Sequence, residues 1–426
     1  MNIQVTIRFC LWAALLLVMT APAAIAATVT VVYVVPGDGF DSAAAADPAS
    51  PAPGATLGAQ RKASFEAAAN FWGLNLTSNV PILVDAQMTP LFCNAGGAVL
   101  GSAGAITAVR DHASFPLAST WYHIGLGNKI ADVDLAPAIS DVGATFNSDI
   151  DNNDSCLFGT NWYYDVVPGA PLANTISFFD VVLHEIGHGI GVSTFVNLSA
   201  GTKLLGFDDT YMTFLEDHNL SGGTLWPLMS NAQRLSSAID GPNTHFTGPA
   251  VQAIVDTEFL TGGVNGGHAM VYAPNPLQSG SSISHWDTSM DRNGTSEIME
   301  PFAVAGAAFL LTFELLEDIG WGPTGSANAF TVSKDFSDDN AAVVDMTLTC
   351  SSGTVTTNPL GASEGSPALF EVTGFLPGAT CTATEAATPG YDQDDSACQV
   401  GGLAAAGGSC TMVNTLEALI FSDGFE

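Results

Sequence analysis

The pattern with the clearest chemistry is the string HEIGH, in which His184 and His188 stand four residues apart and Glu185 follows the first histidine. Residues at this spacing project from one face of a helix, so both imidazoles can bind a single zinc ion. Glu185 is then placed to take a proton from a zinc-activated water. The string predicts metal-assisted hydrolysis; the alternative is a pair of core histidines that bind no metal.

A catalytic zinc needs a third protein ligand and an open position for water. The chain continues as GIGVST, which matches the extension HExxHxxGxxH through its glycine but has Thr194 where the third histidine would stand. The third ligand must then lie elsewhere: another histidine, with His268 first among them, or a carboxylate such as Glu314 or Glu317. The histidines outside the motif are otherwise expected to be surface or hydrogen-bonded residues: His112, His123, His218, His245 and His268.

Three downstream strings carry a resemblance: SHWD at 284–287, EIMEP at 297–301 and TFELLEDIGW at 312–321. Together with HEIGHGIG they resemble leishmanolysin-type metzincins, in which a long insertion separates HExxHxxG from the third histidine. The resemblance implies His285 as the third zinc ligand, Met299 as the methionine of the turn beneath the zinc, and Glu185 as general base. It also extends to bacterial secreted proteins that carry HE[IL]GHG[IL]G and SHWD motifs.

The ligand set implies the hydrolysis of peptide bonds in a protein or peptide substrate. Three neutral imidazoles leave the zinc its full charge, which activates water and polarises a carbonyl. Glu185 takes the water proton and returns it to the leaving nitrogen. The resemblance to metzincins implies that an extended substrate pairs with an edge strand before the helix, and residues 143–147 (GATFN) are the predicted strand. The alternative is a surface adhesion protein whose zinc domain binds a partner without cleaving it, because Thr194 departs from the motif.

A helix must present the two histidines. Residues 177–180 (SFFD) have capping-box spacing, and the apolar residues after them predict a mostly buried helix that ends in the glycines at 189 and 191. The elements expected before it are strands at 28–35, 80–84 and 141–147 and a helix at 60–72. The predicted fold is therefore α+β, a metzincin-like zincin domain with a mixed sheet, followed by a small all-β sandwich.

The chain is predicted to divide after Trp321, where GPTGS is typical of a linker. The expected parts are a signal peptide at 1–26, a zinc-protease domain at 27–322, a β-sandwich at 327–417 and a tail at 418–426. The sandwich is predicted from short alternating segments rich in Thr, Val, Ser and Gly.

The sandwich region resembles Cna-B-like or prealbumin-like modules of surface proteins through four strings: VSKDF at 332–336, CTATE at 381–385, GY at 390–391 and VNT at 413–415. In Cna-B-like domains a lysine and an asparagine form an isopeptide bond that a buried glutamate promotes. The resemblance implies Lys334, Asn414 and Glu385 for these roles, and a role in presentation or adhesion. The alternative is a surface Lys334 in a sandwich that its four cysteines already hold together.

Export is predicted from the N-terminus, where Arg8 precedes an apolar run at 11–19 and small residues that favour cleavage after Ala26. No later apolar run approaches the roughly 20 residues of a membrane span. The six cysteines after the signal are expected to form disulfides, Cys93 with Cys156 and the other four among themselves. The tail resembles the ends of many proteins secreted by Gram-negative bacteria, so we expect an extracellular, periplasmic or cell-surface protein.

The charge of the chain excludes one class of partner. Its 426 residues include 42 Asp and Glu against 9 Lys and Arg, a net charge of −33. Nucleic acids are bound by clustered cations, so a surface this acidic repels them. Within the acidic loop, Asp149, Asp151 and Asn153 offer oxygen ligands at alternate positions and are a candidate calcium site, with a solvated loop as the alternative.

Overall fold

The computed structural model describes residues 26–151, 155–169, 171–220, 222–257, 259–321, 328–350, 354–355, 357–373, 380–398, 401–402 and 408–416. The predicted signal sequence before Ala26, Asn153, the linker at 322–327 and the tail lie outside these residues. The described chain is a mixed α+β structure with several small sheets, which confirms the predicted class. None of its helices is both long enough and apolar enough to cross a membrane.

The first sheet has four strands in the order β1 (Val29–Tyr33), β2 (Ile82–Thr89), β8 (Val142–Asn147) and β5 (Gly101–Ala105). The first three run parallel, and β5 runs antiparallel to β8. Alternate residues of β2 are buried, as expected where one face of a sheet meets a core. The predicted strands at 28–35, 80–84 and 141–147 correspond to β1, β2 and β8.

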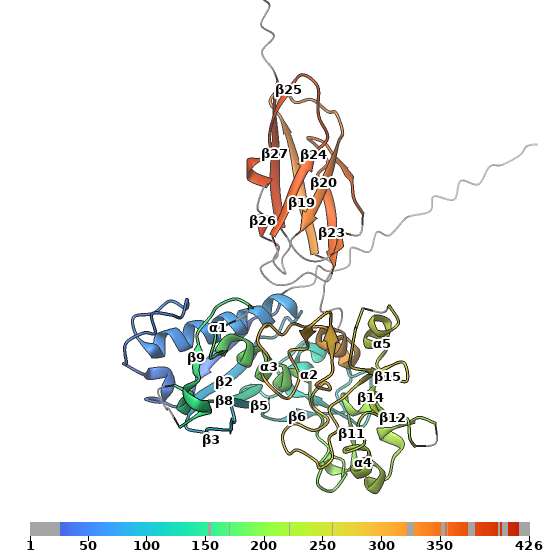
Figure 1. Ribbon diagram of the computed structural model, residues 1–426. Coiled ribbons are helices and arrows are strands. Elements are labelled where there is room, and N and C mark those ends of the chain that lie inside the picture. Colours follow the sequence, from blue (N-terminus) through green and yellow to red (C-terminus); the bar gives the residue numbers. More distant parts are fainter. Residues whose placement is uncertain are drawn as a thin grey trace, which may run out of the picture.

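Two helices, α1 (Leu57–Asn75) and α3 (Phe178–Ile190), lie over this sheet (Figure 1). Phe146 of β8 packs edge-on against both, with ring centroids 5.4 Å from Phe65 of α1 and 5.2 Å from Phe178 of α3. Such aromatic contacts fix the helices relative to the strands. The sheet therefore supports α3, the helix that carries HEIGH.

The prediction that residues 143–147 form the edge strand is wrong. They belong to β8, which has β2 on one side and β5 on the other. The edge strands are β1 and β5, and the one beside α3 is β5, whose sequence GSAGA has neither the β-branched residues nor the alternating hydrophobicity by which a strand is recognised.

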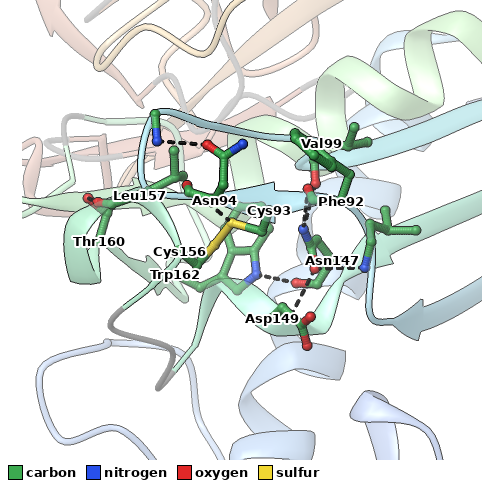
Figure 2. Close-up of a disulfide and its surroundings, with 12 residues drawn as sticks. Phe92, Cys93, Asn94, Val99, Asn147, Asp149, Cys156, Leu157, Thr160 and Trp162 are labelled. Carbon is green, nitrogen blue, oxygen red and sulfur yellow. Dashed lines mark hydrogen bonds between the residues drawn. A yellow bond between two sulfur atoms is a disulfide. The ribbon is translucent and has the colours of Figure 1, made fainter.

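The loops at the ends of β8 and β5 are joined by the disulfide between Cys93 and Cys156 (Figure 2). Asn147, the last residue of β8, donates from its side-chain amide to the carbonyl of Val99 at 2.8 Å, just before β5. Its own carbonyl accepts a 2.8 Å bond from the indole of Trp162. The disulfide and the two hydrogen bonds of Asn147 thus connect the start of β5 to the end of β8 and to the segment that contains Trp162.

After α3 the elements are short. A five-stranded sheet has the order β13 (Thr224–Leu225), β12 (Leu215–Asp217), β14 (Thr244–Phe246), β16 (His268–Met270) and β15 (Val264–Asn265). The helices are α2 (Ile124–Ala131), which precedes α3, and then α4 (Asn231–Ser237), α5 (Pro249–Val255) and α6 (Thr312–Leu316). The carboxylate of Asp318, just after α6, accepts hydrogen bonds from the amides of Ala250 and Val251 in the first turn of α5. These bonds connect the segment after α6 with the start of α5.

The C-terminal region consists of two sheets that share a hydrophobic core. The first has the order β21 (Thr354–Val355), β23 (Ala368–Thr373), β19 (Asn328–Phe336), β27 (Gly408–Leu416) and β25 (Tyr391–Asp394). The second has the order β22 (Leu360–Ala362), β20 (Val344–Cys350), β24 (Thr380–Glu385) and β26 (Gly401–Gly402). Two disulfides, Cys350–Cys381 and Cys398–Cys410, lie within it, so the predicted grouping of the cysteines is confirmed.

Candidate metal centre

The helix α3 begins and ends where its sequence predicts. The hydroxyl of Ser177 accepts a 2.9 Å bond from the amide of Asp180, which caps the N-terminus. The hydroxyl of Ser177 also donates to the buried carboxylate of Asp165, so the cap is itself held in place. At the other end Gly191 has a φ of 143°, which favours glycine and stops the helix.

Two tryptophan indoles from distant parts of the chain fix α3 in the core. Trp72 of α1 donates to the carbonyl of Leu183 at 3.1 Å. Trp321 donates to the carbonyl of Ile190 at 2.8 Å. Both side chains are fully buried, so the helix is clamped near its middle and at its C-terminal end.

The structure brings His184, His188 and His285 together, although 97 residues separate the second from the third. Each pair of Nε2 atoms is 3.1 Å apart. Their ligand atoms lie within 4.8 Å of one another, and among the described residues these three side chains are the group that could hold a metal ion as they stand. His285 comes from a loop after β16, and its carbonyl accepts a 2.8 Å bond from the amide of Tyr272.

The protonation of the three rings follows from their outer contacts. Each Nδ1 bonds a backbone carbonyl at 2.7–2.8 Å: His184 to Ile298, His188 to Val192 and His285 to Ser281. A carbonyl can only accept, so the hydrogen of each neutral ring is on Nδ1 and each Nε2 has a free lone pair. Burial lowers the pKa of all three imidazoles, that of His188 to about 3, so the rings are neutral.

Three lone pairs that face one another with no hydrogen between them repel, and a cation removes this repulsion. Two nitrogens bound tetrahedrally to zinc at about 2.0–2.1 Å lie about 3.3 Å apart, close to the separation found here. The Nδ1 bonds also orient the rings in the way typical of metal-binding histidines. The residues therefore fit a metal ion without rearrangement.

Glu185 lies beside this group with its side chain against the edge strand. The amide of Ala103 in β5 donates to its carboxylate. A Cβ at Gly101 would lie 3.0 Å from Oε1 of Glu185, so the absence of a side chain there leaves the carboxyl group its space. Burial raises the pKa of Glu185 to about 8, against the opposing effect of the Ala103 bond. A cation at the histidines would lower this pKa again by favouring the charged form.

Met299 lies directly under the helix turn between the two motif histidines. A Cβ at Gly187 would lie 2.8 Å from the Met299 sulfur, so a larger residue at this position of the motif would require the end of the Met299 side chain to shift. The neighbouring carbonyl of Ile298 holds His184, and the carbonyl of Met299 accepts a 3.0 Å bond from the amide of Trp286, next to His285. One turn of chain therefore supports two of the three histidines.

Glu297, which the sequence analysis did not single out, anchors that turn. It is 1% exposed, and its carboxylate accepts bonds from the amides of Leu310 and Leu311 and from the hydroxyl of Thr312. Burial raises its pKa to about 7. Its position in the string EIMEP was the available signal, because a charged residue next to a buried Ile-Met pair needs partners.

Thr194 supports the His285 loop and does not belong to the group of three histidines. Its hydroxyl donates to the buried carboxylate of Asp209 at 2.7 Å, and its amide bonds the hydroxyl of Ser284 at 3.4 Å. Asp209 also accepts from the amide of Phe195, and burial raises its pKa to about 6. Thr194, which stands at the last position of the HExxHxxGxxH pattern, thus contacts Ser284, the residue before His285.

The alternative ligands lie elsewhere. Glu314, Glu317 and His268 are not in the group of three histidines. The calcium prediction also loses a ligand: Asp151 forms an ion pair with Arg61 at 2.7 Å and accepts a bond from the hydroxyl of Tyr164. A carboxylate neutralised in this way is a poor ligand for a cation.

A second group of buried polar side chains lies in the C-terminal region. Nζ of Lys334 is 3.2 Å from Oε2 of Glu385, with 0% and 3% of these side chains exposed. Asn414 is fully buried, and neither its side-chain atoms nor Nζ of Lys334 has a hydrogen bond among the described residues. Lys334 pairs with Met412 on the neighbouring strand, so Asn414 lies two residues further along the same face. A surface position for Lys334 is therefore wrong.

Comparisons with known proteins give no relative. No protein-family model matches the chain, and no curated protein or solved structure matches it. The chemistry of the centre has to be inferred from its own geometry: three neutral imidazoles with converging lone pairs, a buried carboxyl group and the edge of a sheet.

Proposed function

We propose that this protein is a zinc-dependent endopeptidase. His184, His188 and His285 would hold zinc, and the observation that carries the proposal is the convergence of their three Nε2 lone pairs beside the buried carboxyl of Glu185. Neutral imidazoles are preferred zinc ligands, and three protein ligands leave a position open for chemistry. Bound zinc would activate water and polarise the scissile carbonyl.

Glu185 moves the proton in this reaction. Its carboxylate takes a proton from the attacking water, and the resulting acid gives it to the amide nitrogen as the C–N bond breaks. Burial raises the pKa of Glu185, and bound zinc would lower it again, so the carboxylate would be ionised when it accepts the proton and could then donate it.

The substrate would bind along the open edge of β5. Its hydrogen bonds to β8 use even-numbered residues, as at Leu100 and Ile106, because in an antiparallel pair every second residue faces the partner. The main-chain groups of Gly101, Ala103 and Ala105 consequently face away from β8, and the amide of Ala103 donates to the carboxylate of Glu185. An extended peptide paired there would have its backbone beside the general base, and these small residues permit a close approach.

Kinship with leishmanolysin-type metzincins and a zincin fold belong to the same proposal. They are supported by the parallel strands with an antiparallel edge strand, by His285 reached after a long insertion, and by Met299 beneath the motif helix. Secretion is supported by the three disulfides, which are compatible with an extracellular protein.

The test is casein hydrolysis by the mature protein beside two variants, Glu185→Gln and His285→Ala, with zinc content measured for each. The expected result is cleavage by the parent alone, with zinc kept by Glu185→Gln and lost by His285→Ala. A parent that binds zinc but cleaves neither casein nor a diverse peptide library would contradict the proposal and favour the alternative, a binding protein. Equal cleavage by parent and Glu185→Gln would refute the role of Glu185.

We also propose that Lys334 and Asn414 are joined by an isopeptide bond. The proposal is supported by the buried ion pair of Lys334 with Glu385 and by the buried side chain of Asn414, whose two polar atoms have no hydrogen bond among the described residues. Glu385 takes a proton from the Lys334 ammonium, and Nζ attacks Cγ of Asn414. Glu385 passes this proton to Nδ2 as the Nζ–Cγ bond forms and the Cγ–Nδ2 bond breaks, so that the nitrogen leaves as ammonia. The new amide keeps one hydrogen on Nζ, and the remaining Nζ proton passes to the Glu385 carboxylate. Such a crosslink between neighbouring strands suits a module that presents the protease or adheres to a surface.

Intact mass after disulfide reduction tests this crosslink. The parent is expected to be lighter than its sequence by one ammonia, and Lys334→Met and Glu385→Gln are expected to have full sequence mass. A parent at full sequence mass would refute the bond.

A further inference from the structure

A second histidine cluster lies on the five-stranded sheet, outside the centre described above. It consists of Glu216 on β12, His218 just after it, His245 on β14 and His268 on β16. Glu216 is directly opposite His245 in the register, and His245 is opposite Met270, two residues from His268. Side chains two residues apart share a face, so all four project from the same side of the sheet.

The three imidazoles of this cluster are in mutual contact. The ring centroid of His218 lies 4.2 Å from that of His245 and 4.8 Å from that of His268. The outer two rings, His245 and His268, are 6.0 Å apart. Nε2 of His218 is 3.0 Å from a carboxylate oxygen of Glu216. In the first centre the corresponding centroid distances are 4.6–5.0 Å, so the second cluster is wider at its His245–His268 pair, and its ligand atoms are not all as close to one another as those of the first centre.

Nitrogens of this cluster lack the partners that buried polar atoms normally have. His245 is fully buried, and neither of its ring nitrogens makes a hydrogen bond of acceptable geometry to a described residue; the carbonyl of Pro242 is the backbone group that affects its pKa. Nδ1 of His268 is buried without a partner as well. A surface position is therefore wrong for His245. An unsatisfied buried nitrogen destabilises the fold, and a bound cation would satisfy it.

The turn that carries His268 is built for this contact. Gly266 and Gly267 have φ values of 58° and 86°, as in a two-residue hairpin between β15 and β16. A Cβ at Gly266 would lie 2.9 Å from Nδ1 of His218, so glycine is needed both for the turn and for the space that this nitrogen faces.

We propose that His218, His245 and His268 form a second metal site for a transition-metal ion that prefers imidazole, such as zinc. Glu216 accepts the Nε2 hydrogen of His218, which leaves Nδ1 of that ring free for the metal. Imidazoles on one tetrahedral ion have centroids about 5 Å apart, so binding draws His268 about 1 Å toward His245. The ion would join strands β12, β14 and β16, and this role is independent of proteolysis.

The test counts zinc per chain in the full mature protein. Metal is removed with a chelator and zinc is added back. Unbound zinc is then removed by gel filtration, and the zinc that remains with the protein is measured by inductively coupled plasma mass spectrometry. The parent is expected to hold two ions per chain. The His285→Ala variant is expected to hold one, and so is the double variant His218→Gln/His268→Gln. Both substituted histidines of the latter variant are partly exposed, so it is expected to fold, as its circular dichroism would verify. His112→Gln, which changes a partly exposed loop histidine outside both clusters, is the matched control and is expected to keep two.

The background of His285→Ala separates this site from the first. In that variant, zinc is expected to raise the melting temperature, and adding His218→Gln and His268→Gln is expected to abolish the rise. One ion in the parent that is lost in His285→Ala would refute the second site while leaving the protease proposal intact. Two ions retained by the His218→Gln/His268→Gln variant would refute it as well.

Discussion

The substitution Gly187→Ala tests how closely Met299 and the motif helix fit together. In an isolated helix this change is stabilising, by about 1 kcal/mol, because alanine is the better helix former. In this protein the new Cβ would lie 2.8 Å from the sulfur of Met299 and 3.1 Å from its Cε. Met299 is fully buried, so the end of its side chain has to shift within a packed core, and overpacking of this kind costs about 1–3 kcal/mol. We expect a net destabilisation of up to about 2 kcal/mol, opposite in sign to helix propensity.

Urea unfolding of the zinc-free protein, followed by tryptophan fluorescence, measures this change. All tryptophans lie at or before Trp321, so their fluorescence reports on the N-terminal region alone. Zinc affinity, measured by competition with a chelator, is expected to fall as well, because displacing Met299 moves the carbonyl that holds His184. A gain of about 1 kcal/mol with unchanged zinc affinity would show that the helix is free of Met299 and would refute the reasoning.

The matched control is the double variant Gly187→Ala with Met299→Ala. Truncating a buried methionine costs about 2–5 kcal/mol on its own, because it leaves a cavity. The new methyl group occupies part of that cavity, so the double variant is expected to be more stable than the sum of the single changes by about 1 kcal/mol or more. Additive effects would mean that the two side chains do not meet.

Three further predictions concern the same centre. Glu185→Gln is expected to lower kcat for peptide hydrolysis by about 10²–10⁴-fold with zinc content unchanged, since it removes only the proton acceptor. The folded protein holds a proton on Glu297 up to about pH 7 and the unfolded chain only to about pH 4.5, so zinc-free stability is expected to fall as pH rises between these values, and a urea series on Glu297→Gln should lose part of that slope. Thr194→His is expected not to add a zinc ligand but to cost about 1–3 kcal/mol of stability, because Asp209 loses its hydroxyl partner; a higher zinc affinity would contradict this.

Local signals in the sequence were sufficient to predict the motif helix. Ser177 as the cap, the buried apolar stripe and the glycine at 191 define its limits, and the histidine spacing places two imidazoles on one face. His285 could be proposed only through the resemblance, because nothing local distinguishes it from His268. Which of the two meets the motif depends on how the long segment after α3 folds.

Contacts between distant segments explain what the sequence analysis missed. The strand β5 has a sequence of glycine, serine and alanine without periodicity, and its place at the sheet edge is decided by pairing with β8. The burial of Lys334 depends on Glu385 of the opposite sheet, which no spacing rule reveals. The second histidine cluster needs three strands in register before its members meet.

The Nδ1 bonds of the three histidines all end on the main chain, and this has a consequence for variation. A carbonyl oxygen keeps its position whatever side chain its residue carries, so the residues at 192, 281 and 298 can change identity while the rings stay oriented. Substitutions at these positions therefore leave the orientation of the three imidazole rings unchanged as long as the backbone keeps its path. Centres of this type would tolerate diverse neighbours around an unchanged ligand set, and sequences that look unrelated outside the motif could share one geometry.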